Sequence, residues 1–161
     1  MNTLNMADLK WMFISGANNL SNHYKEVDAL NVFPIPDGDT GTNMMMTIQS
    51  GINEIQPIEE NNVGVLATTF SKGLLLGARG NSGVILSQIF KGFGDAIKEK
   101  EKLNLMDFAM AFQSGKEKAY KAVLKPVEGT MLTVIRESSE ALLQFLNEHK
   151  KVSFEEAMEL M

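Results

Sequence analysis

Residues 62–97 read NVGVLATTFSKGLLLGARGNSGVILSQIFKGFGDAI and hold two apolar helical patterns separated by a glycine-rich segment. Apolar side chains recur at helical spacing in both halves, at Val65, Leu66, Phe70 and Leu74 in the first and at Leu86, Ile89, Phe93 and Ile97 in the second. Asn61 or Asn62 can cap the first of these helices. The stretch therefore predicts the third and fourth helices of the chain, the fourth starting at Val84, with Gly77–Gly83 between them.

The rest of the chain carries the same periodicity. Helices are predicted over residues 5–22, 42–55, 105–120 and 130–147, and a seventh opens at the capping box of Ser153 and Glu156. Asn5 and Asn104 are the expected caps of the first and fifth helices. No window shows sustained strand-like alternation, so the predicted fold class is all-α.

Composition limits the class of protein. The chain has 161 residues, 44% hydrophobic and 22% charged, which fits a single globular domain. A net charge of -5 argues against a general phosphate-backbone binder, so we expect no nucleic-acid partner. There is no cysteine, and no apolar stretch approaches the roughly 20 residues that span a bilayer. We expect an intracellular, cytoplasmic protein without a membrane span.

Because the chain stops two turns into its seventh helix, we treat residues 1–161 as one C-terminally truncated domain.

The first candidate site follows a loop that is stiffened by Pro34 and Pro36. Asp37 and Asp39 are one residue apart, and their mutual repulsion is relieved when a divalent cation such as magnesium binds between them. Thr40 and Asn43 add a hydroxyl and an amide at a helix start, where free N–H groups favour anions. The alternative is a turn with an aspartate helix cap, which explains these residues about equally well.

The second candidate is Gly77-Ala-Arg-Gly-Asn-Ser-Gly83. Glycine-rich backbone at a helix start makes an anion pocket, and Asn81 and Ser82 could donate to phosphate oxygens. Close helix packing through small residues explains this cluster equally well. The acidic and the glycine-rich clusters together indicate a metal and phosphate site.

A third candidate is the break at Lys125–Met131. Thr130 could cap the following helix or contact a ligand, and Met131 could lie against a flat ring. A plain interhelical turn is the favoured interpretation of this segment taken alone.

At these three clusters the sequence closely resembles the N-terminal kinase domain of the bacterial fatty acid kinase ATP-binding subunit, which is related to the ATP-binding subunit of dihydroxyacetone kinase. The matching segments are Asn31–Met44, Ser71–Gln88 and Lys125–Thr133, in that order. The resemblance implies an antiparallel helical barrel of the dihydroxyacetone kinase nucleotide-binding type that holds Mg-ATP at one end.

The resemblance also implies roles for individual residues. Asp37 and Asp39 match the aspartates that hold two magnesium ions on the nucleotide. The dihydroxyacetone kinases have a further upstream aspartate, whose nearest counterpart by position is Asn31. The remaining implied contacts are to phosphate for Thr40, Asn43, Gly80, Asn81 and Ser82, and to adenine for Thr130 and Met131. Arg79 could support the transition state or anchor the loop.

The implied reaction is transfer of the γ-phosphate of ATP to the carboxylate of a fatty acid that a separate fatty-acid-binding protein presents, giving an acyl phosphate. A carboxylate is already ionised near neutral pH and needs no general base. The alternatives are a kinase for a small hydroxylated substrate of the dihydroxyacetone type, and a nucleotide-binding regulatory module without chemistry. The relatives of the dihydroxyacetone branch carry a histidine where this chain has Thr40. Downstream domains of the family could form a homodimer, and without them the fragment could be inactive.

Overall fold

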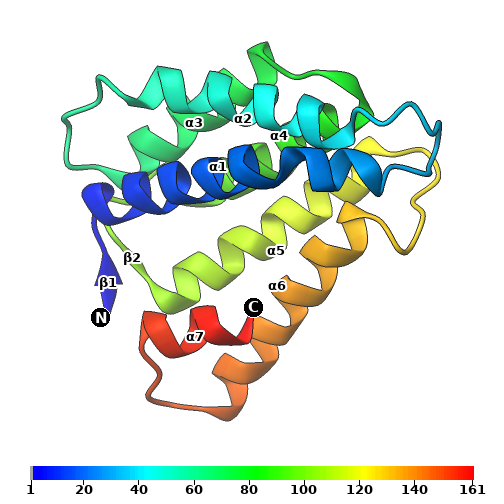
Figure 1. The fold of residues 1–161 in the computed structure, drawn as a ribbon. Helices are drawn as coiled ribbons and strands as arrows, with labels where there is room; N and C mark the ends of the chain where they lie inside the picture. The colour runs from blue at the N-terminus through cyan, green and yellow to red at the C-terminus, as the bar shows by residue number, and fades with distance from the viewer. Residues whose placement is uncertain (1) are drawn as a thin grey trace.

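The computed structural model describes residues 2–161. They form seven α-helices and one pair of very short strands (Figure 1). In chain order these are β1 (Thr3–Leu4), α1 (Met6–Ala29), α2 (Thr40–Ile55), α3 (Val63–Leu76), α4 (Gly80–Ile97), β2 (Leu103–Asn104), α5 (Leu105–Ala122), α6 (Met131–Glu148) and α7 (Phe154–Leu160). The all-α prediction is confirmed.

Local capping explains where most of the helices begin. Asn5 accepts a hydrogen bond from the backbone N–H of Asp8, whose side chain in turn accepts from the N–H of Asn5. The same reciprocal capping box opens α5 at Asn104 and α7 at Ser153. Asn62 caps α3. Each cap satisfies backbone donors that the first turn of a helix leaves without a partner.

Three boundaries differ from the sequence prediction. Helix α1 continues to Ala29 instead of ending near residue 22, because residues 23–29 lack a helix breaker and pack against the start of α2. Helix α2 begins at Thr40, two residues early, and α4 begins at Gly80 instead of Val84. Tertiary packing overrides the low helix propensity of glycine at both starts. The predicted glycine-rich interruption is therefore shorter, because its last four residues, 80–83, form the first turn of α4.

The two strands were not predicted from the sequence. Leu4 pairs with Leu103 and Thr3 with Asn104 in an antiparallel ladder. Two residues are too few to show alternation. Both leucines are buried, so the pair ties the N-terminus to the loop before α5.

A chain of aromatic rings runs through the core and joins helices that are distant in sequence. Phe13 of α1 stacks on Phe70 of α3 with ring centroids 4.3 Å apart. Phe93 of α4 meets Phe108 of α5 edge to face at 5.8 Å, and Phe108 meets Phe154 of α7 at 5.6 Å. A cavity of about 180 Å³ lies among these rings. The core thus spans the helices from α1 to α7.

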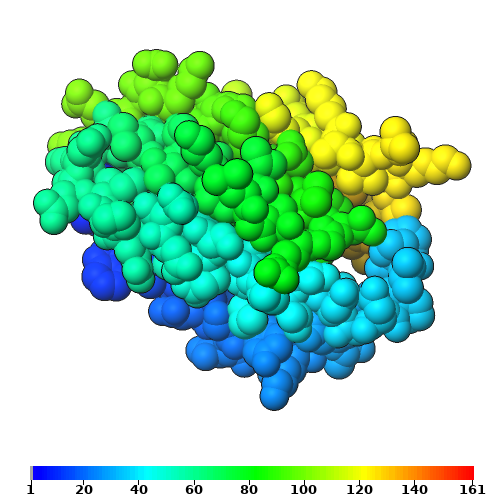
Figure 2. Space-filling model, turned by 90° about the horizontal axis from the view of Figure 1, so that it is seen from above, coloured from blue at the N-terminus to red at the C-terminus, as the bar shows by residue number. Residues whose placement is uncertain are grey.

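Alternating helix direction brings the starts of α2, α4 and α6 to one end of the molecule (Figure 1). Seen from above, the segments near residues 31–40 and 120–130 border each other at this end, in light blue and yellow (Figure 2). Among residues 2–161, none of the helices combines the length and apolar character that crossing a bilayer requires.

Candidate functional site

The acidic loop, residues 31–39, carries the paired aspartates between α1 and α2. Asn31 fastens this loop from inside. Its amide oxygen accepts from the backbone N–H of Asp39 at 3.2 Å, and its amide nitrogen donates to the carbonyl of Ile35 at 3.1 Å. The oxygen of Asn31 retains a second lone pair, so this side chain can hold the loop and still offer an oxygen to a ligand.

The two carboxylates of the acidic loop face each other. Partial loss of solvent around Asp37, together with its hydrogen bond to Asp39 and the repulsion between the two groups, raises the pKa of Asp37 above its usual value. Asp39 is the N-cap residue of α2, yet its side chain makes no capping hydrogen bond. The interpretation of these residues as a simple aspartate cap is therefore wrong for Asp39.

The donor set of the acidic loop suits magnesium. Among residues 2–161, no three or more histidine, cysteine, aspartate or glutamate side chains gather closely enough to hold a metal. The acidic loop itself offers the carboxylates of Asp37 and Asp39, together with the amide oxygen of Asn31. Magnesium is commonly bound in this way, by one or two carboxylates while phosphate oxygens and water complete the octahedron. The residues present fit that ion in combination with a polyphosphate.

The glycine-rich segment, residues 77–83, lies directly against the start of α2. The Ser82 hydroxyl donates to the carbonyl of Thr40 at 3.3 Å. Gly80 has a φ of +63°, and a β-carbon placed there would come within 2.5 Å of the amide nitrogen of Asn43. The structure therefore brings Thr40 close to Ser82 and Asn43 close to Gly80.

The close-packing interpretation of these glycines also holds in part. A β-carbon on Gly83 would come within 2.4 Å of the Thr47 hydroxyl, and that hydroxyl accepts from the backbone N–H of Arg79 at 3.1 Å. Arg79 is exposed, and within residues 2–161 its guanidinium has no hydrogen-bond or ion-pair partner. Its backbone, not its charge, fastens the segment. Asn81 is exposed at the same helix start.

The third candidate, Thr130 with Met131, opens α6. The Thr130 hydroxyl accepts from the N–H of Leu132 at 3.3 Å and donates to the carbonyl of Val127 at 2.7 Å. Thr130 is thus a helix cap. Met131 is half-buried and packs against the core. Within residues 2–161, no hydrogen bond joins this loop to the acidic loop or to the glycine-rich segment.

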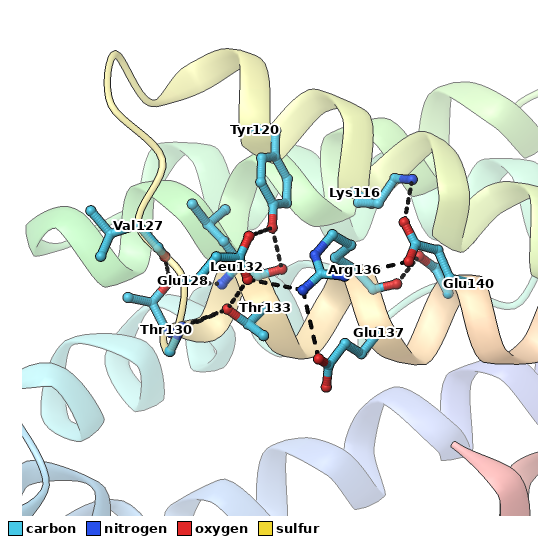
Figure 3. A network of polar contacts seen from close by, with 12 residues as sticks. Lys116, Tyr120, Val127, Glu128, Thr130, Leu132, Thr133, Arg136, Glu137 and Glu140 are labelled. Carbon is cyan, nitrogen blue, oxygen red and sulfur yellow. Dashed lines mark hydrogen bonds and ion pairs between the residues drawn. The ribbon is translucent and has the colours of Figure 1, made fainter.

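A polar network holds this third loop on α6 (Figure 3). One Glu128 oxygen accepts from the Thr133 hydroxyl at 2.7 Å and from Arg136 at 2.9 Å, and the other accepts from the Tyr120 hydroxyl at 3.1 Å. The hydrogen bonds from Arg136 and then Thr133 lower the pKa of Glu128. Thr133 also accepts from the N–H of Gly129 at 2.8 Å. The network fixes the backbone on which Thr130 lies.

Sequence reasoning missed Asp28 and Thr47. Asp28 lies at the end of α1 and accepts from both the backbone N–H and the hydroxyl of Thr42, at 2.8 and 2.7 Å. Thr47 is fully buried and its hydroxyl donates to the carbonyl of Asn43 at 2.7 Å. Thr47 could have been found from the sequence, because it is a polar residue on the apolar stripe of α2. The sequence holds no comparable signal for Asp28.

Comparison with known proteins identifies the family of this chain. Residues 34–161 match the family described as the DAK2 domain. This chain belongs to that family, and so it is a dihydroxyacetone kinase-like nucleotide-binding module.

Several staphylococcal proteins are similar to this chain. A protein of Staphylococcus epidermidis is 56% identical over 137 residues, which cover 85% of this chain and 25% of that protein. A Staphylococcus saprophyticus protein is 55% identical over 133 residues, 83% of this chain and 24% of its own length. One from Staphylococcus aureus strain USA300 is 53% identical over 150 residues, 93% of this chain and 26% of its own length. All three are described as uncharacterized proteins. The chain spans about a quarter of the length of these relatives.

Proposed function

We propose that this chain is the Mg-ATP-binding module of a kinase that phosphorylates the carboxylate of a fatty acid carried by a separate binding protein. The observation that carries the proposal is the pairing of Asp37 with Asp39 at the start of α2, directly against the start of α4. A cation that binds between the two carboxylates would complement phosphate groups that accept hydrogen bonds from the helix N–H groups.

Each group has a defined task in this proposal. Asp37 and Asp39 would hold two magnesium ions, which supply positive charge to the phosphate oxygens. The backbone at Gly80 approaches the phosphates because it has no side chain, and the amides of Asn43 and Asn81 donate to them. Thr130 and Met131 border the base. These contacts orient the γ-phosphate and offset its charge, the two effects on which phosphoryl transfer depends.

The acceptor is inferred from the chemistry of the site and from the resemblance. In the transfer, an oxygen of the acceptor carboxylate forms a bond to the γ-phosphorus while the bond to the β-phosphate oxygen breaks, and ADP leaves. No proton has to be removed from an ionised carboxylate. His23 is exposed on α1 and its ring nitrogen contacts the carbonyl of Asn19, and His149 lies beyond α6. Within residues 2–161, no hydrogen bond or ion pair joins either histidine to the acidic loop, which favours an acceptor that needs no base.

A second candidate, a kinase for a small hydroxylated substrate, is favoured by the match to the DAK2 domain itself. One experiment compares three samples that contain the chain and Mg-ATP: one with a fatty-acid-loaded binding protein, one with dihydroxyacetone, and one with neither. Formation of acyl phosphate in the first sample alone supports the proposal. Phosphorylation of dihydroxyacetone would support the second candidate. If a full-length relative such as the Staphylococcus aureus protein also binds ATP without transfer to either acceptor, a regulatory module is supported and both kinases are disfavoured.

A further inference from the structure

The start of α2 is capped by a residue from another helix. Thr42 occupies the third position of α2, and its N–H is a group that an N-cap aspartate normally accepts from. Asp39 occupies the N-cap position, but its side chain accepts no hydrogen bond from this N–H. Asp28, eleven residues earlier, accepts it instead at 2.8 Å and accepts the Thr42 hydroxyl at 2.7 Å.

The location of Asp28 is unfavourable for its own helix. It is the next-to-last residue of α1, where the negative end of the helix dipole repels a carboxylate, and the last turn of α1 has no basic residue. The start of α2 is the positive end of that helix's dipole, which attracts a carboxylate. Burial alone would raise the pKa of Asp28, but the hydrogen bonds from Thr42 and from the N–H of Gly41 outweigh it and lower the pKa. The side chain therefore serves α2, not α1.

Backbone packing keeps the two helices in reach of this contact. A β-carbon on Gly41 would come within 2.1 Å of the carbonyl oxygen of Tyr24, so the end of α1 and the start of α2 touch through their backbones. The carbonyl of Asp28 also accepts from the N–H of Asn31 at 3.1 Å, and Asn31 in turn holds the N–H of Asp39. Asp28 is thus linked to both ends of the acidic loop.

We propose that Asp28 is a positioning residue that caps α2 in place of Asp39, so that the Asp39 carboxylate stays free to face Asp37 and bind a cation. The cation half of this inference rests on the proposed function, whereas the capping half does not. Without Asp28, the N–H groups of Gly41 and Thr42 lose their acceptor. Asp39 already occupies the N-cap position of α2, so its carboxylate turns to cap the helix and away from Asp37.

A double-mutant cycle on thermal stability tests the capping half. In the wild type, Asp39→Ala should leave the melting temperature unchanged or raise it, because it removes repulsion from Asp37 and no cap. In the Asp28→Ala background the same change should lower the melting temperature by about 2–4 °C, since Asp39 is now the cap. An Asp8→Ala background is the matched control, because Asp8 belongs to the capping box of α1, and there Asp39→Ala should behave as in the wild type.

The opposite result is equally clear. If Asp39→Ala changes the melting temperature by the same amount in the wild-type and Asp28→Ala backgrounds, Asp39 does not replace Asp28 and the inference is wrong. Should Asp28→Ala not fold, the cycle is run with Asp28→Asn. Its amide oxygen can still accept from the Thr42 N–H, so a smaller change of the same sign is expected.

Binding of Mn²⁺, measured alone by electron paramagnetic resonance, tests the cation half. Asp28→Ala should weaken Mn²⁺ binding by about 10-fold to 100-fold, the usual effect of losing a residue that orients a ligand, and Asp28→Asn should restore part of it. Unchanged Mn²⁺ affinity in Asp28→Ala would overturn the positioning role even if the stability cycle shows capping. If the wild type binds no Mn²⁺ either alone or together with ATP, the proposed function fails, and the stability cycle still decides whether Asp28 caps α2.

Discussion

Replacing Gly80 with alanine tests the contact between the two main parts of the site. Gly80 has a φ of +63°, a conformation that an alanine adopts only with strain, so the variant should lose about 1 kcal/mol or more of its free energy of unfolding. The added β-carbon would also come within 2.5 Å of the Asn43 amide nitrogen. That nitrogen is at the end of a flexible side chain and can move at little cost in free energy. The clash should therefore weaken Mg-ATP binding more than it lowers the free energy of unfolding.

Two other glycines separate these effects. Gly129 has a φ of +78° and open space where its β-carbon would be, so Gly129→Ala carries the strain without a clash. Gly16 is inside α1 with nothing within 4 Å, and Gly16→Ala should gain up to about 1 kcal/mol from helix propensity. In thermal denaturation we expect Gly80→Ala and Gly129→Ala to melt about 2–4 °C below the wild type, and Gly16→Ala to melt at or above it.

The binding assay is calorimetric titration with Mg-ATP. A displaced Asn43 loses a hydrogen bond to a charged phosphate, worth about 1.5–3 kcal/mol, so Gly80→Ala should bind roughly tenfold or more weakly. Gly16→Ala should bind like the wild type. If Gly80→Ala binds Mg-ATP as tightly as Gly16→Ala does, Asn43 does not contact the phosphates and the site as drawn is wrong.

Four further predictions follow from the structure. Asp37→Asn or Asp39→Asn should weaken magnesium-dependent ATP binding, by calorimetry, while the helical circular dichroism stays intact; equal affinity would contradict the metal site. Phe70→Ala should cost about 3–5 kcal/mol in chemical denaturation, because Phe70 is fully buried, and a loss under 1 kcal/mol would mean that the ring chain is not the core. Folding lowers the pKa of Asp28, so the stabilisation that ionised Asp28 gives the fold is present above its unfolded pKa and is lost as pH falls through its folded pKa. Asp28→Asn should therefore make the free energy of unfolding depend less on pH in the acid range. An unchanged pH dependence would refute this. Glu128→Gln should speed amide exchange at Gly129 with little change in melting temperature; unchanged exchange would show that the network does not hold the loop.

The features that sequence reasoning predicted correctly are local ones. The caps at Asn5, Asn104 and Ser153 depend on residues three positions apart, and each is found where the pattern puts it. Helical periodicity likewise depends on neighbours within two turns. These interactions are complete within a short segment, so the segment alone is enough to predict them.

The features that were missed depend on tertiary contacts. Asp28 and Thr42 are 14 residues apart, and Thr47 and Arg79 are 32 apart. The early starts of α2 and α4 also depend on tertiary contacts, because the low helix propensity of glycine is overridden where atoms of another helix occupy the space that a side chain would fill. Gly41 against Tyr24 and Gly83 against Thr47 are such cases. Propensity could not predict these starts, since the determining atoms lie on other helices.

The location of the site follows from the topology. Successive helices alternate in direction, so every second helix begins at the same end (Figure 1). The acidic loop precedes α2, the glycine-rich segment precedes α4, and the loop with Thr130 precedes α6. Three segments that looked separate in the sequence must therefore meet at one end once the chain folds as an up-and-down bundle. All three helices point their N-termini to this end, so it is the positive end of three helix dipoles, and the first turn of α4 has no side-chain cap. The helix dipoles favour an anion there, and a cation between the proposed anion and the two aspartates would offset their repulsion. A magnesium polyphosphate satisfies both demands at once, whereas a bare anion or a bare cation satisfies one.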